Sequence, residues 1–247
     1  MLGLVILILA IVAAAGGVAW SAAKPLQRYR RIRDTPTAPI KELGNGFFEI
    51  RGRVATPLTP LISPYSDMPC VYYSFRIQER RTTGYGKRRR TRWVTVVSDT
   101  RAADCFLEQG GHRAEVHIEH AELVLKVDHH GSSGFLNSPT EELKQRLGER
   151  YDFATEGTLF NRSLRYRETV VRAGELLYVL GSCRLGPDRL PCFDGGEDLF
   201  IVADRPEAEV ALRFLWFGIA GYALAAVLGV GAVALAVWAA ISGASLR

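Results

Sequence analysis

The chain has 247 residues, of which 48% are hydrophobic, and its formal net charge is +5. When two apolar terminal runs are set aside, roughly 190 residues remain, enough for one ordinary soluble domain or two small ones. Positive charge is concentrated in two tracts, because residues 24–33 carry five bases and no acid, and residues 76–92 carry eight bases and one acid. The rest of the polar segment is acidic, which excludes a nucleic-acid-binding domain with a generally basic surface.

An apolar run over residues 2–23 opens the chain, and the basic tract follows it. No Lys or Arg precedes this run. A secretory signal peptide has the opposite polarity, with its positive charge before the apolar segment. We therefore interpret residues 1–23 as an uncleaved transmembrane helix.

A second uncharged run extends from Phe214 to Ile241. As a helix it would rise about 42 Å, whereas the hydrocarbon core of a bilayer is roughly 30 Å thick. Gly221, Ala225 and Gly229 recur at every fourth position, which is the small-residue pattern of helix packing in membranes. These residues would pack against the first helix or form a homodimer, and the first alternative is preferred because one domain tethers both helices.

The charges beside the two runs predict the orientation of the protein. Lys and Arg that flank a membrane span stay in the cytoplasm. Arg28, Arg30 and Arg31 follow the first run and Arg213 precedes the second, so both basic flanks adjoin the intervening domain. The protein is predicted to be a membrane protein with two spans and a cytoplasmic domain. The same bases are expected to attract anionic lipid, at about 1 kcal/mol per base.

Between the spans, the patterns predict a linker and then a β-rich domain. Prolines at 36 and 39 exclude a helix over residues 35–40. Alternating apolar and polar residues indicate short strands. The predicted strands are 48–54, 70–79, 93–97, 103–107, 114–120, 123–127, 164–171, 176–181 and 199–203, and the predicted loops are 56–69, 128–137 and 185–197.

One soluble helix is predicted, with Ser138 as its N-cap and Glu141 completing a capping box. It would end at Gly148. The fold class is therefore a mainly β domain, an antiparallel barrel or sandwich with one short helix, between two transmembrane helices. The expected segments are 1–23 helix, 24–41 stem and linker, 42–205 β domain, 206–213 lead-in, 214–241 helix and 242–247 tail.

The densest positive charge lies at a predicted hairpin tip. Its bases are Lys87, Arg88, Arg89, Arg90 and Arg92. Such a tip either contacts phosphate groups or is solvated and kept soluble by charge repulsion, and the second reading is the more common. A partner is expected to contact this tip or the face that carries Tyr72, Tyr73 and Trp93.

Four cysteines form no CxxC pair, and we interpret them as free, partly buried thiols. A Cys183–Cys192 disulfide is the alternative. Among the five histidines, His117 and His120 are three positions apart, so that on a strand they would point to opposite faces. The sequence therefore predicts no metal site.

No sequence motif selects a catalytic residue. The chain lacks a GxSxG elbow, a P-loop and a GxGxxG turn. We therefore predict no catalytic residue and no cofactor, and the partners expected are the bilayer and an unidentified protein.

Three stretches resemble the GIDE domain of the MULAN/MAPL family of mitochondrial E3 ubiquitin ligases. They are SPYSDMPCVYY at 63–73, FLEQGGHRAEVHIEHAEL at 106–123 and RYRETVVRAGELLYVLG at 165–181. Trp93 follows a variable hairpin, and the order of span, β-rich domain and span is also similar. The resemblance covers about residues 42–203 and implies a domain that binds a substrate or partner.

In these ligases a zinc-binding RING follows the second span and recruits the ubiquitin-conjugating enzyme. A RING needs Cys/His ligands in pairs, whereas the residues after Ile241 include neither Cys nor His. The resemblance thus implies a bacterial, RING-less relative in the inner membrane. Its GIDE-like domain would act as a membrane-proximal interaction or scaffold module. The alternatives are a ligase-like component whose activity another chain supplies, and a membrane enzyme of another class.

Overall fold

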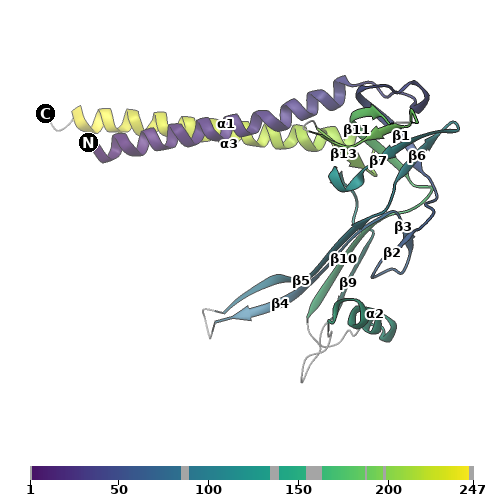
Figure 1. The fold of residues 1–247 in the computed structure, drawn as a ribbon. Helices are drawn as coiled ribbons and strands as arrows, with labels where there is room; N and C mark the ends of the chain where they lie inside the picture. The colour runs from purple at the N-terminus through teal and green to yellow at the C-terminus, as the bar shows by residue number, and fades with distance from the viewer. Residues whose placement is uncertain are drawn as a thin grey trace. The chain divides into compact units, whose positions relative to one another are not determined.

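The computed structural model describes residues 2–84, 89–133, 139–153, 163–186, 188–196 and 199–244 (Figure 1). The chain divides into two compact units. The helical unit contains residues 1–36 and 206–247, and the β unit contains residues 37–205.

The helical unit consists of α1 (Leu2–Asp34) and α3 (Glu207–Ala244), which lie side by side and run antiparallel (Figure 1). Their 33 and 38 residues correspond to lengths of about 50 and 57 Å. Both helices are long and apolar enough to cross a membrane, and the most apolar 18-residue windows of α1 and α3 have mean hydropathies of 2.5 and 2.4. α1 continues through the basic tract and ends at Asp34, because Pro36 disfavours a helical conformation of the residue before it.

Small residues bring α1 and α3 close together. A Cβ added at Gly218 would lie 2.6 Å from Cγ of Leu26, and one at Gly221 would lie 2.6 Å from Cβ of Ala22. At Gly229 an added Cβ would meet no atom within 4 Å. Ala225 is half-buried. The close approach of the two helices is therefore centred on Gly218 and Gly221.

A leucine in place of Gly221 should force the two helices apart, whereas a leucine in place of Gly229 has room. Overpacking of this kind costs about 1–3 kcal/mol. We expect Gly221→Leu to lower the free energy of unfolding by that amount and Gly229→Leu to change it by less than about 0.5 kcal/mol. Unfolding of the full chain in detergent micelles measures both, and equal losses would contradict this packing.

Five strands of the β unit close into a barrel in the order β1-β6-β7-β12-β11, because β1 also pairs with β11. Their bounds are Gly46–Val54 for β1, Phe106–Gln109 for β6, His112–Val116 for β7, Leu176–Leu185 for β11 and Pro191–Phe193 for β12. β13 (Ile201–Ala203) and β8 (Glu122–Val124) extend the sheet from β11. The pairs β7–β12 and β8–β13 are parallel, and the other pairs of this sheet are antiparallel. The predicted mainly β domain between two apolar helices is confirmed.

Apolar side chains fill the barrel, and one buried carboxylate lies among the strands. Ile50, Leu177 and Val179 are fully buried. Glu49 is the neighbour of Ile50 on β1, so its side chain points to the other face of the sheet, and it is buried there as well. Its carboxylate accepts a hydrogen bond of 2.9 Å from the Tyr178 hydroxyl and another from Oγ1 of Thr37. These donors compensate for the hydration that the carboxylate loses on burial.

A separate four-stranded antiparallel sheet has the order β5-β4-β10-β9. Its strands are β4 (Tyr72–Thr83), β5 (Arg90–Ala102), β9 (His129–Ser133) and β10 (Leu164–Val171). One face packs against α2 (Glu141–Tyr151). Tyr73, Phe75 and Ile77 are all fully buried on that face, so the alternation predicted for residues 70–79 is confirmed.

Asp99 on β5 connects this sheet to α2. It accepts hydrogen bonds of 2.7 Å from the hydroxyls of Tyr73 and Tyr151 and lies 3.4 Å from the guanidinium of Arg101. Burial alone would raise the pKa of the Asp99 carboxyl, but the two hydroxyl donors and Arg101 outweigh it and hold the pKa below its usual value. A depressed pKa adds stability above the unfolded-state pKa, and this stability is lost as the pH falls through the folded-state pKa.

The β unit should therefore lose stability as the pH falls below about 4, the usual pKa range of a carboxyl. We expect Asp99→Asn to be less stable at neutral pH and to show a shallower decline in acid. Chemical unfolding of the full chain across the acid range measures the slope. Asp104→Asn, at an exposed carboxyl, is the matched control, and a wild-type slope in Asp99→Asn would contradict the prediction.

Three short strands lie in segments predicted to be loops, and a fourth begins in one. β2 (Leu61–Ile62) lies within residues 56–69 and pairs with β3 (Pro69–Cys70), which begins at the last residue of that segment; β9 lies within 128–137, and β12 lies within 185–197. These segments are rich in Gly, Pro, His and Ser and show no period of two. Long-range pairing makes β9 and β12 into strands, since β9 pairs with β10 and β12 pairs with β11 and β7.

The soluble helix has different ends from those predicted. Thr140 is the N-cap, and its Oγ1 accepts a hydrogen bond of 3.3 Å from the backbone nitrogen of Leu143. Ser138, the predicted cap, lies outside the described residues. The helix continues past Gly148 to Tyr151, whose side chain is held by Asp99. Tertiary contact at Tyr151 accounts for the extra turn, because a glycine only weakens a helix locally.

Candidate functional site

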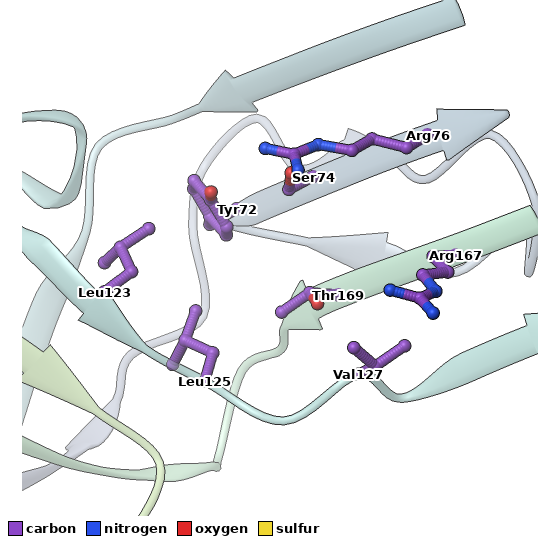
Figure 2. A pocket seen from close by; sticks show the side chains of 8 residues that line it. All are labelled: Tyr72, Ser74, Arg76, Leu123, Leu125, Val127, Arg167 and Thr169. Carbon is purple, nitrogen blue, oxygen red and sulfur yellow. The ribbon is translucent and has the colours of Figure 1, made fainter. Parts of the chain in front are cut away.

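A groove lies between two parts of the β unit: the face of the four-stranded sheet that does not pack against α2, and the stretch from Leu123 on β8 to Val127 (Figure 2). Its volume is about 340 Å³. β4 and β10 contribute mainly polar side chains, and β8 and the segment after it contribute apolar ones. The lining residues are Tyr72, Ser74, Arg76, Leu123, Leu125, Val127, Arg167 and Thr169.

Two arginines dominate the charge of this groove. Arg76 on β4 and Arg167 on β10 are directly opposite in the strand register, and both are exposed. Within the described part of the chain, neither guanidinium forms a hydrogen bond or an ion pair. Like charges directly opposite on neighbouring strands are destabilising. An anion placed between them would relieve this repulsion.

Hydroxyl groups adjoin the two arginines. Ser74 and Thr169 are also opposite in the register, and Oγ of Ser74 lies 3.1 Å from Oγ1 of Thr100. Tyr72 closes this end of the groove and is only 5% exposed. Burial raises the pKa of its phenol, although Ser74 and Arg76 act in the opposite direction. Tyr72 is therefore a neutral hydroxyl at physiological pH, able to donate or accept a hydrogen bond.

None of the described residues of the predicted hairpin tip lines this groove. Lys87 and Arg88 lie outside the described residues, and Arg89 directly precedes β5. Arg90 and Arg92 are exposed on β5, opposite Thr83 and Arg81. They belong to the other face of the sheet from Arg76, because side chains alternate along a strand.

The aromatic residues predicted to share one face are divided between two. Tyr72 and Trp93 share the groove face. Trp93 on β5 is opposite Arg80 on β4, and Arg80 lies eight positions after Tyr72, an even number that places both on the same face. Tyr73 lies on the α2 face and is fully buried, so its predicted place in this surface is wrong. Trp93 is 39% exposed, and the guanidinium of Arg165 lies 4.2 Å from its ring centroid.

Arg28, Arg30 and Arg31 belong to α1 in the helical unit. Arg28 lies 5.7 Å from the ring centroid of Phe214 on α3, which is a cation–π contact.

The groove arginines were not predicted as a site. The sequence places Arg76 on an outward face, but its pairing with Arg167 joins residues far apart in the chain.

A second cluster gathers histidine, cysteine and carboxylate side chains at one end of the barrel. Glu115, His117 and Cys192 form one group of metal-ligand atoms that lie within 4.8 Å of one another, and His117, His120 and Asp194 form another. The strand predicted over 114–120 ends at Val116, and residues 118–120 form a 3₁₀ helix. His117 directly precedes this helix, and the Nδ1 atoms of His117 and His120 both contact Oδ1 of Asp194, at 3.0 and 2.6 Å. The prediction that His117 and His120 point to opposite faces is therefore wrong.

All four cysteines are free. Burial raises the pKa of Cys70 and of Cys183 to about 11 and that of Cys105 to about 12, so these thiols are poor nucleophiles. Cys183 is opposite Phe193 in the register and Cys192 is opposite Arg184. Cys183 and Cys192 therefore point to opposite faces of the sheet, which prevents the disulfide that the sequence left open.

Comparison of this chain with protein-family models, with curated proteins and with solved structures finds no match. Its function is therefore interpreted from geometry. Among the described residues, two arrangements of side chains could bind a ligand. They are the arginine-lined groove and the cluster around His117.

Proposed function

We propose that this chain is a membrane protein with two spans whose β unit is a membrane-proximal interaction module. Its binding surface is the groove, and its ligand is an acidic, extended segment of a protein partner. The observation that supports this most directly is the pairing of Arg76 with Arg167, two opposed cations with no anion beside them among the described residues.

The lining of the groove suits a short stretch of peptide. Each guanidinium can hold a carboxylate through two parallel hydrogen bonds. The hydroxyls of Ser74 and Thr169 can pair with a peptide backbone. Leu125 and Val127 form an apolar wall opposite the strands, and Val127 is 50% exposed, so this wall can receive an apolar side chain (Figure 2). An acidic segment with alternating apolar residues therefore complements both walls.

The same lining favours binding over catalysis. Guanidinium groups stay protonated in proteins, and serine and threonine hydroxyls are weak acids and bases without a neighbouring base. These groups can orient a ligand, but they do not exchange protons with it at neutral pH. We therefore propose that the groove recruits a partner.

A peptide that alternates glutamate and leucine should bind the full chain in neutral detergent, whereas its lysine–leucine counterpart should not. A hydrogen bond to a charged group contributes about 1.5–3 kcal/mol. We therefore expect Arg76→Gln and Arg167→Gln each to weaken binding at least about tenfold. Fluorescence anisotropy of the labelled peptide measures the affinity.

The matched control is the double variant Arg90→Gln/Arg92→Gln, which removes two charges from exposed positions outside the groove. It should leave peptide affinity nearly unchanged. Loss of binding in this control and not in the groove variants would assign binding to the predicted hairpin instead. Tight binding to phosphatidylglycerol vesicles that depends on Arg76 and Arg167, with none to the peptide, would make lipid the ligand and overturn the proposal.

We further propose that the β unit is cytoplasmic, in a bacterial inner membrane, with the arginines of α1 near anionic headgroups. The support is the position of Arg28, Arg30 and Arg31 after the first span, where such charge stays cytoplasmic. The relationship to the GIDE domain is also a proposal and rests on the three sequence stretches. A ligase-like role is the alternative that this resemblance implies, and no side-chain arrangement among the described residues favours it.

Reporters fused after Arg247 test the orientation. In a bacterial host, alkaline phosphatase at this position should be active and a fused green fluorescent protein should be dark, because this end is expected in the periplasm. Fusions after Pro36 should show the reverse pattern and serve as the control. Fluorescence of the Arg247 fusion would place the β unit on the periplasmic side.

A further inference from the structure

We propose that Glu115, His117 and Cys192 bind one zinc ion at the end of the barrel. The site is separate from the groove, and the proposal does not rest on the function assigned to that groove. The ligand atoms would be Oε1 of Glu115, Nε2 of His117 and Sγ of Cys192. These three atoms all lie within 4.8 Å of one another.

The separations match a tetrahedral zinc site. Nε2 of His117 lies 3.2 Å from Oε1 of Glu115 and 3.8 Å from Sγ of Cys192. With ordinary zinc–ligand bond lengths and tetrahedral angles, these separations should be about 3.3 and 3.6 Å. His117 therefore already lies at a suitable separation from both other ligands, which lie within 4.8 Å of each other.

The remaining ring nitrogen of His117 has the partner that a metal-bound histidine normally has. Nδ1 lies 3.0 Å from Oδ1 of Asp194, and the same carboxylate oxygen lies 2.6 Å from Nδ1 of His120. A ligating histidine usually donates its second N–H to a carboxylate, which fixes the tautomer and orients the ring. Asp194 is a positioning residue for His117 in this arrangement, and His120 holds Asp194.

The donor set selects the metal. A thiolate favours zinc over calcium or magnesium, which prefer oxygen ligands, and imidazole and carboxylate complete a set that zinc accepts. Three protein ligands leave one coordination position for water or for a group of a partner. The ligands are half-exposed, with side-chain exposures of 33% for His117 and 32% for Glu115, so the ion can enter from solvent.

The position of the site within the barrel indicates its role. Cys192 on β12 and Glu115 on β7 are directly opposite in the parallel pair, and this pair comprises only two registered positions. His117 follows β7 and donates its backbone N–H to the carbonyl of Phe193 at 2.9 Å. A zinc ion bound across this pair would stabilise one of the two shortest strand pairings of the barrel, since β1 and β6 also pair at only two positions.

The full chain, purified in detergent with any affinity tag removed, should contain one zinc ion by elemental analysis. Cobalt(II) substituted at the site should show the charge-transfer absorption of a cobalt–thiolate bond. We expect Cys192→Ser to abolish this absorption, and Asp194→Asn to weaken zinc binding by about 10–100-fold. Zinc should raise the Tm of the wild type but not that of His117→Gln.

His112→Gln is the matched control, because His112 is exposed at the start of β7, and it should bind zinc as the wild type does. Absence of the thiolate absorption from the wild type would overturn the proposal. So would undiminished zinc binding in Cys192→Ser. Dependence on His120 and Asp194 without Cys192 would assign the ion to the other group and overturn the ligand set. The Cys192 side chain lies outside the barrel core, so Cys192→Ser keeps the test decisive should His117→Gln fail to fold.

Discussion

Pairing of β1 with β11 is the interaction on which the β unit depends. The two strands are in register over eight residue pairs, from Gly46 opposite Cys183 to Arg53 opposite Leu176. This pairing joins the beginning of the domain to its end and turns five strands into a closed barrel. Closure pairs the strand edges that would otherwise be exposed. It also buries Glu49, whose partner Tyr178 lies on β11.

Both candidate sites form where segments distant in the chain meet. The groove combines β4, β10, β8 and the segment after β8, and the proposed zinc site combines β7, the residue that follows it and β12. Arg76 and Arg167 repel each other across the sheet, and an anion between them would relieve this repulsion. In the second site, the carboxylates of Glu115 and Asp194 flank the two ring nitrogens of His117, so the negative charge there attracts a cation.

Local patterns predicted the elements with strong periodicity. The strand over 70–79 shows why, because its alternating apolar residues face one packed side of a sheet and are buried there. The segment around His129 was predicted to be a loop, since Gly, His and Ser have weak preferences for a strand. Pairing with β10 overrides these preferences. The histidine cluster was missed because a strand was assumed through His120, where the chain forms a 3₁₀ helix instead.

The sequence by itself determined that a mainly β domain lies between two apolar helices. Hydropathy and two-residue alternation are local properties, and they are visible without knowledge of any contact. Only the tertiary structure decided that Arg76 opposes Arg167 and that Glu115, His117 and Cys192 converge. The physical reason is that strand register sets these encounters, and register depends on how whole strands pair across the sheet.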